Sequence, residues 1–281
     1  MSGWPPITDP ELLRRLALPD EAFREELLGF ASSVGERAFT DAEYTLALGY
    51  PWPRPPSSFA LDGDEVTPLG AWDAAVADGR HPLLAFGSNG APETLIRKFA
   101  HLPERDRRVV VLAGDLHDFD VAAAGYPTAY GSFPATLVAS PGTALRASVL
   151  WVTPEQLTAL TWTEISYRLG RLDGVTFTPD IDGPPAIDHV LAYSSRWGAH
   201  VVDGELAALA ALPARGRTAP AYDQEHLLDD LARRVLGPEA GARDLVAWIY
   251  ADFGVAAARM GPVLQDTARP FASDRWTPYP A

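Results

Sequence analysis

Residues 81–99 read HPLLAFGSNGAPETLIRKF. The apolar run Leu83–Phe86 predicts a short buried strand. A polar loop, Gly87–Gly90, follows it and contains the only asparagine of the chain, Asn89. Behind the loop, Pro92 stands at a first-turn position and apolar residues recur at helical spacing to the end of the stretch. The stretch therefore predicts a strand, a glycine-flanked loop and a helix in direct succession.

The loop Gly87–Gly90 admits four interpretations. The Asn89–Gly90 pair favours a hairpin turn, but the segment behind it has helical spacing. A serine nucleophile elbow needs a glycine two residues before Ser88, where Phe86 stands, and the lysine or glycine spacing of a phosphate loop is absent. A neutral connector between strand and helix remains open. An anion site is favoured because glycines let successive N–H groups point the same way and the helix start adds positive charge.

Strand-like segments are concentrated in the middle of the chain. Beyond the opening stretch they lie at 109–112, at 116–121, at 135–139, at 145–152 after a Pro141–Gly142 turn, and at 187–193. Helical patterns lie on both sides, at 9–34, 203–212, 222–236 and 241–259. The sequence therefore predicts an α+β fold in one domain. It divides into a helical and Pro-rich extension over 1–80, a core over 81–200, and a helical extension over 201–281 packed on the core.

Composition narrows the class of function. The chain has 281 residues, of which 47% are hydrophobic, and a formal net charge of −14. Nucleic acids and anionic membranes attract a positive surface, so neither is expected as a partner. Without cysteine, disulfides, thiolate metal sites and cysteine nucleophiles are excluded. No signal peptide or membrane-spanning run is recognisable, so a cytoplasmic protein is expected, and the only lysine, Lys98, indicates coding bias rather than function.

Glu164 is a second position that favours chemistry. It follows the helix that a capping box at Thr153–Gln156 opens. A carboxylate at a helix C-terminus meets the negative end of the dipole, and its aromatic sequence neighbours Trp162 and Tyr167 exclude water. Both effects disfavour the charged form, which suits a general acid/base. A solvated surface glutamate is the competing interpretation.

The segment Asp115–Asp120 carries carboxylates and a histidine, His117, as metal sites do. Strand alternation places Asp115 and His117 on one face, and Asp118 and Asp120 on the other, so no clean ligand face emerges. No metal site is therefore expected there.

Together, the loop and the glutamate resemble the γ-glutamylcyclotransferase superfamily, which includes AIG2-like proteins. Members of this family open with a strand that runs into Tyr-Gly-Ser-Asn and a helix, and the corresponding residues here are Phe86–Asn89. Later in the family come a strand and a short helix that ends in Leu-Asp-x-x-Glu. Here Ala147–Val152 leads to Leu160–Glu164. The resemblance covers roughly residues 81 to 195.

The resemblance implies a small mixed, partly closed β-sheet or barrel wrapped by the terminal helices. It implies an enzyme that cleaves a γ-glutamyl amine or peptide: the α-amine of the substrate attacks its own γ-carbonyl and releases 5-oxoproline and a free amine, with neither a metal nor a cofactor. By family position Glu164 moves the protons. The loop amides would hold the glutamyl carboxylate or the oxyanion, and two tyrosines are pocket walls or hydroxyl donors. The expected substrate-binding residues are Phe86, Gly87, Ser88, Asn89, Gly90, Tyr167 and Tyr193.

The chain departs from the family pattern at Phe86, Ser148 and Thr161, where tyrosine, glycine and aspartate are usual. The departures at Ser148 and Thr161 keep a second class of function open: a catalytically silent member that binds a small molecule or a protein partner through the same cavity. A hydrolase that depends on Ser88 is a third alternative. The amine and the oligomeric state stay open at this point.

Overall fold

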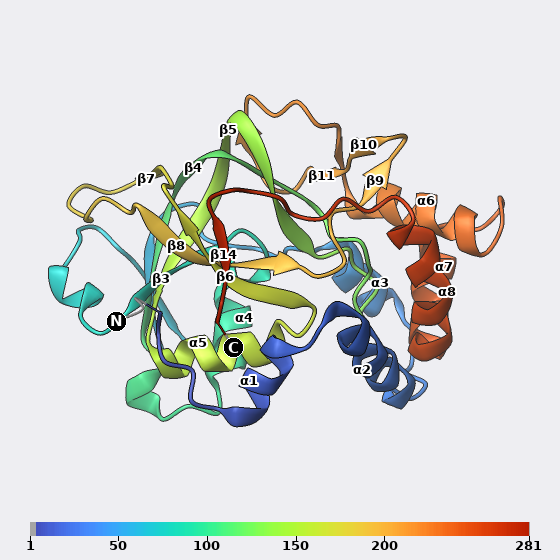
Figure 1. The fold of residues 1–281 in the computed structure, drawn as a ribbon, viewed down its shortest axis with the longest axis horizontal. Helices are drawn as coiled ribbons and strands as arrows, with labels where there is room; N and C mark the ends of the chain where they lie inside the picture. The colour runs from blue at the N-terminus through green and yellow to red at the C-terminus, as the bar shows by residue number, and fades with distance from the viewer. Residues whose placement is uncertain (1–3, 281) are drawn as a thin grey trace.

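A computed structural model describes residues 4–280 and shows a mixed α+β fold, in which one large sheet lies between two groups of helices (Figure 1). The α-helices in these residues are α1 (Pro10–Ala17), α2 (Asp20–Ser33), α3 (Asp41–Leu48), α4 (Pro92–Phe99), α5 (Pro154–Thr163), α6 (Gln224–Val235), α7 (Ala242–Ala251) and α8 (Phe253–Gln265). Short 3-10 turns are η1 (Ala74–Ala77), η2 (Ser88–Gly90) and η3 (Glu104–Asp106). None of the helices in the described part is long and apolar enough to span a membrane. The α+β class expected from the sequence is confirmed.

The sheet has a central path and several strands beside it. The path runs β13-β11-β4-β5-β3-β8-β6-β14, while β1, β2, β7 and β12 pair at its sides and β9 pairs with β10 separately. The strands are β1 (Phe59–Asp62), β2 (Glu65–Pro68), β3 (His81–Ala85), β4 (Val109–Ala123), β5 (Ala135–Val152), β6 (Tyr167–Asp173), β7 (Phe177–Pro179), β8 (His189–Ser195), β9 (Val201–Val202), β10 (Glu205–Leu206), β11 (Ala208–Leu209), β12 (Ala214–Arg215), β13 (Ala221–Tyr222) and β14 (Trp276–Pro278).

The strand that precedes the loop, β3, is an interior strand. It pairs antiparallel with β5 and parallel with β8. Its side chains alternate between two hydrophobic cores. Leu83 and Ala85 face the core shared with α1, α4 and α5, whereas Leu84 and Phe86 face the core shared with α6, α7 and α8. The loop that follows β3 is therefore anchored from both faces of the sheet.

Strands β4 and β5 are long, with 15 and 18 residues, and each joins two segments that the sequence predicts as separate strands. The expected Pro141–Gly142 turn lies within β5. A bulge follows His117 in β4, where Asp118 has a φ of 66° and its carboxylate accepts a hydrogen bond from the amide of Gly142 at 3.0 Å. The break expected in β5 thus lies opposite a local irregularity, whereas the break expected in β4 at 113–115 is regularly paired with β5, and neither break ends a strand.

The sheet is open. Among residues 4–280 its edge strands β13 and β14 do not pair with each other, so the sheet does not close into a barrel. Segments outside 81–200 extend it, because β1 pairs with β4 and β14 pairs with β6. The two ends of the chain also meet, where the Tyr279 hydroxyl donates to the carbonyl of Pro5 at 2.8 Å.

Two helical expectations after residue 200 are wrong. Residues 203–212 contain the short strands β10 and β11, because Asp203 and Gly204 turn the chain at positive φ (51° and 84°) and β11 pairs with β4. This pairing overrides the helix propensity of the alanines and leucines there. The single helix expected over 241–259 is two helices, since Asp252, with a φ of −155°, ends α7 and accepts a hydrogen bond from the amide of Val255 at the start of α8.

One buried histidine makes the stability of this fold depend on pH. His200 stacks on Phe133 with 5.2 Å between ring centroids, and neither ring nitrogen has a hydrogen-bond partner in the described part of the chain. Burial lowers its pKa from the ordinary 6.5 to about 4. Between these values the unfolded chain binds a proton that the folded chain does not. The contribution of His200 is therefore fully present above pH 6.5 and is lost as the pH falls toward 4.

We expect this residue alone to lower the free energy of unfolding by about 2–3 kcal/mol between pH 7 and pH 4.5. Urea denaturation of the wild type and of His200→Phe at both pH values measures the effect, because phenylalanine keeps the stacking and does not titrate. The wild type should lose more stability than the variant on acidification. An equal loss in both proteins would contradict the assignment.

Candidate functional site

The loop after β3 is a tight 3-10 turn, η2, that leads directly into α4. The amide of Gly90 donates to the carbonyl of Gly87 at 3.1 Å, and Pro92 is the first residue of α4. Gly87 has to be a glycine because a Cβ there would lie 2.6 Å from the hydroxyl oxygen of Tyr50. The strand, loop and helix predicted from this stretch are confirmed, in direct succession.

Helix α5 carries Glu164 at its end. The predicted capping box is present, because Thr153 and Gln156 exchange hydrogen bonds between side chain and amide. Gln156 is also fully buried and donates to the carbonyls of Asp106 and Arg108, which fixes the start of the helix. Glu164 directly follows the last helical residue, and its amide donates to the carbonyl of Leu160 at 3.1 Å. Its side chain therefore projects from a well-anchored backbone.

Glu164, Asn89 and Lys98 form a closed triangle of hydrogen bonds, which we call the Glu164 cluster. The Glu164 oxygen Oε1 accepts from Asn89 Nδ2 at 3.0 Å and from Lys98 Nζ at 2.7 Å. Lys98 Nζ also donates to Asn89 Oδ1 at 2.7 Å. The side chains of Lys98 and Glu164 are 8% and 14% exposed. The fold thus joins two residues singled out in the sequence, 75 positions apart, and adds Lys98, which the sequence analysis attributed to coding bias alone.

The two oxygens of the Glu164 carboxylate differ in their surroundings. Oε1 has two donors, whereas no residue between 4 and 280 donates a hydrogen bond to Oε2. The arrangement leaves one carboxylate oxygen, Oε2, open to a ligand.

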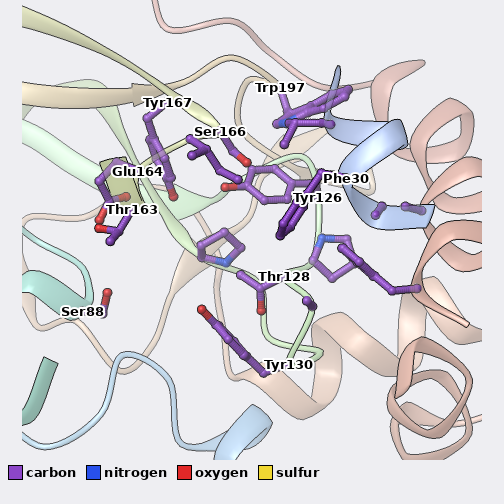
Figure 2. A pocket seen from close by; sticks show the side chains of 18 of the residues that line it. Phe30, Ser88, Tyr126, Thr128, Tyr130, Thr163, Glu164, Ser166, Tyr167 and Trp197 are labelled. Atoms are coloured by element: carbon purple, nitrogen blue, oxygen red, sulfur yellow. The ribbon is translucent and has the colours of Figure 1, made fainter. Parts of the chain in front are cut away.

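Two hollows meet at Glu164. One is a recess of about 30 Å³ beside the loop, which has room for a water-sized group. The other is a cavity of about 690 Å³. The two share Ser88, Glu164 and Tyr167 among their lining residues. Figure 2 shows Glu164 and Ser88 on one side of the cavity, and Phe30 and Trp197 on the opposite side.

All but one of the residues expected at the site line the recess. They are Phe86, Gly87, Ser88, Asn89, Glu164, Tyr167 and Tyr193. Gly90 does not line it and faces Arg54 instead, whose Nη1 would lie 3.1 Å from a Cβ at this position. The glycine at 90 therefore makes room for Arg54 behind the loop.

The amides of the loop are not equally available to a ligand. The amide of Gly90 is engaged within the turn, whereas in the described part of the chain no carbonyl oxygen accepts from the amides of Gly87, Ser88 or Asn89. The Ser88 amide lies beside the Tyr50 hydroxyl. Of the four amides expected to hold an anion, those of Gly87 and Asn89 are left to do so.

The hydroxyl groups of Tyr167 and Tyr193 both donate hydrogen bonds to other groups of the protein. Tyr167 donates to the carbonyl of Ala135 at 2.7 Å. Thr161 donates to the carbonyl of Leu157 at 2.7 Å, so Tyr193, whose oxygen lies 2.8 Å from Thr161 Oγ1, is the donor of that pair. Burial raises the pKa of both tyrosines and keeps them neutral. Of the two roles left open from the sequence, these contacts favour pocket walls.

Three residues around the loop were not singled out from the sequence. The hydroxyl of Tyr50 accepts from the amide of Ala135 at 2.9 Å, and Arg54 donates to the carbonyl of Gly87 at 3.3 Å. No local pattern connects either residue with the loop. Lys98 did leave a signal, since the only lysine of the chain lies nine positions after its only asparagine.

The acidic segment Asp115–Asp120 forms ion pairs with arginines. Asp115 lies 2.8 Å from Arg215, and the buried Asp120 lies 2.7 Å from Arg217. Among the residues that the structure describes, no three His, Cys, Asp or Glu side chains gather as a metal site would require. The carboxylates of this segment join the sheet to the chain beyond β11.

Comparison with known proteins yields no family assignment. No protein-family model matches the chain, and no curated protein matches it. A functional conclusion therefore has to come from the Glu164 cluster and the two hollows around it.

Proposed function

We propose that the protein is a γ-glutamylcyclotransferase-like enzyme, which cleaves a γ-glutamyl amide and releases 5-oxoproline and a free amine. The observation that carries this proposal is the position of Glu164. Its carboxylate is tied to the loop through Asn89, its Oε2 accepts no hydrogen bond from residues 4–280, and Glu164 lines both the recess and the cavity. A general acid/base has to be held within hydrogen-bond reach of the reacting atoms. The Glu164 cluster supplies such a group.

The same resemblance is our proposal for the type of fold. The unit β3–η2–α4 carries the loop, and the β4–β5 pair then leads to α5, which ends at Glu164. This is the order of the two family motifs. The sheet is open and includes strands from both ends of the chain, so the proposed likeness concerns the segment from β3 to β8.

The reaction forms one bond and breaks one. The α-amino nitrogen of the substrate attacks its γ-carbonyl carbon, which closes a five-membered ring, and the bond from this carbon to the leaving nitrogen then breaks. Glu164 Oε2 takes a proton from the α-ammonium group and gives it to the leaving nitrogen. The second proton lost by the attacking nitrogen ends on the released amine, so the balance needs no further reactant. Because nucleophile and carbonyl belong to one molecule, correct positioning contributes about 7–11 kcal/mol.

Positive groups lie where the substrate carries or develops negative charge. Lys98 directs two of its hydrogens to Asn89 and Glu164, which leaves the third for the substrate α-carboxylate. The amides of Gly87 and Asn89 hold the γ-carbonyl oxygen as it becomes an oxyanion. The recess has the volume of a single such oxygen, so the glutamyl chain lies in the adjoining end of the cavity.

A screen of γ-glutamyl compounds tests this proposal. We expect the purified protein to convert at least one γ-glutamyl amide or peptide into equal amounts of 5-oxoproline and free amine, measured by mass spectrometry. Glutaryl amides, which lack the attacking α-amine, are the matched controls and should not react. Release of glutamate in place of 5-oxoproline, or no product across the panel, would contradict the proposed activity.

A catalytically silent binding protein is the second candidate, and the ion pair between Lys98 and Glu164 is the observation that favours it. Lys98 lies 2.7 Å from this carboxylate, so the pair can hold the loop in place without moving a proton. Under this alternative the same γ-glutamyl compounds bind and are not converted. Isothermal titration calorimetry, run beside the screen, separates the two candidates: binding without product supports the silent protein, and product formation excludes it.

A further inference from the structure

The larger cavity extends from Glu164 to a wall built by segments near the two ends of the chain. Helices α2 and α8 lie side by side (Figure 1), and they approach so closely that a Cβ at Gly254 would lie 2.8 Å from the Cα of Ser32. From these helices the cavity is lined by Leu27, Phe30, Ala31, Ala257 and Met260, among others. This wall lies outside the β3–β8 segment that carries the loop and Glu164.

Aromatic side chains lead from Glu164 toward this wall. Tyr167 contacts Tyr126 with 6.5 Å between ring centroids, and Tyr126 contacts Trp197 at 6.0 Å. The guanidinium of Arg24 lies over the Trp197 ring, 5.0 Å from its centroid. Figure 2 shows Tyr126 and Trp197 gathered with Phe30 across the cavity from Glu164. These contacts give the cavity a formed aromatic surface.

The charged side chains that line the cavity include a single carboxylate, and it lies at one end. Among the described residues that line it, Glu164 is the only acidic one, and its Oε1 is already paired with Lys98. Arg97 adds a further positive group beside Lys98 on α4. An ammonium group carried toward the aromatic wall would have no carboxylate to pair with, and an unpaired buried charge is strongly unfavourable. The cavity therefore suits an uncharged apolar group.

We propose that this cavity binds the leaving amine of the substrate, and that this amine carries a large aromatic or apolar group without a second positive charge. The inference rests on the proposed cyclotransferase function and specifies its substrate class. γ-Glutamyl arylalkylamides are then good substrates. γ-Glutamyl conjugates of polyamines and of very small amines are poor ones.

Pairs of synthetic substrates test the inference through release of 5-oxoproline. The kcat/KM for γ-glutamyl 2-phenylethylamide should exceed that for γ-glutamyl methylamide by about 10²-fold, because the larger group removes more apolar surface from water. γ-Glutamyl pentylamide should exceed its isosteric 4-aminobutylamide by about 10-fold or more, because the latter places an ammonium group where the former has a methyl group. Equal values within either pair would overturn the inference and leave the proposed function standing.

A variant of the wall tests whether the preference arises in this cavity. Ala257→Phe narrows the cavity from α8, and Ala258→Phe, at the exposed next position of the same helix, is the matched control. Ala257→Phe should lower kcat/KM for the phenylethylamide by about 10-fold or more and leave that for the methylamide nearly unchanged, since only the larger amine fills the narrowed space. Ala258→Phe should alter neither value. An equal loss for both substrates in Ala257→Phe would contradict the assignment.

A binding measurement distinguishes failure of this inference from failure of the proposed function. The probe is glutaric acid 2-phenylethylamide, which has no α-amine and cannot cyclise, and its Kd is measured by calorimetry. If the probe binds the wild type more tightly than Ala257→Phe and no γ-glutamyl amide is converted, the proposed function is refuted and the apolar ligand site is supported. No binding to the wild type would overturn the inference itself.

Discussion

Glu164→Gln is expected to lower kcat/KM for 5-oxoproline release by about 10²- to 10⁴-fold. Glutamine keeps the shape of the side chain and an oxygen that can accept from Asn89 and Lys98, so the loop stays in place. It cannot take the proton from the substrate α-ammonium group. The loss should appear in kcat, because the missing interaction belongs to the transition state. Initial rates with the best substrate of the screen measure it.

Glu155→Gln is the matched control for this variant. Glu155 lies at an exposed position in the first turn of α5, so the variant makes the same substitution in the same helix. Its kcat/KM should equal that of the wild type. Thermal denaturation of both variants shows whether the fold is kept. Unchanged activity in a folded Glu164→Gln variant would remove Glu164 from the role of acid and base.

Lys98→Met is expected to lower kcat/KM by about 10- to 10²-fold, because the ammonium makes two charge-assisted hydrogen bonds, each worth about 1.5–3 kcal/mol. Methionine has a similar length and keeps the apolar stem, so the change removes the charge without leaving a large void. Without the ammonium, Asn89 and Glu164 lose their common partner and the carboxylate is no longer held at the recess. The loss should appear in both kcat and KM, since Lys98 positions Glu164 and also contacts the α-carboxylate of the bound substrate.

Two further variants separate the charge of Lys98 from general damage to α4. Lys98→Arg keeps the charge in a different geometry and should restore part of the activity. Glu93→Met replaces an exposed charged residue in the first turn of the same helix, which lines neither hollow, and should have little effect. Full activity in Lys98→Met, or equal losses in Lys98→Met and Glu93→Met, would contradict the positioning role.

Local sequence patterns predicted much of what surrounds the site. The capping box at Thr153–Gln156 begins α5, and the apolar run before Gly87 forms β3, because caps and periodicities depend on residues close in sequence. Asn89 and Glu164 stood out for the same reason, since Asn89 lies in the loop after a predicted strand and Glu164 follows a predicted helix. Residues 203–212 show where this reasoning fails: their alanines and leucines favour a helix, and pairing of β11 with β4 decides otherwise.

Contacts between distant segments could not be predicted in this way. Lys98 and Glu164 are 66 positions apart, and their ion pair exists only because α4 and α5 pack against each other. The aromatic cavity depends in turn on the close approach of α2 and α8, where Gly254 meets Ser32. The loop and the glutamate were thus visible in the sequence, whereas the position of Lys98 beside Glu164 and the larger cavity required the fold.

The most direct test of intramolecular attack is the reaction in ¹⁸O-labelled water. Mass spectrometry follows the products from a γ-glutamyl amide that the wild-type protein converts. Cyclisation by the substrate α-amine predicts 5-oxoproline without ¹⁸O, an equal amount of free amine, and no glutamate. Glutamate that carries ¹⁸O would show that water attacks the carbonyl, and it would contradict the cyclotransferase proposal.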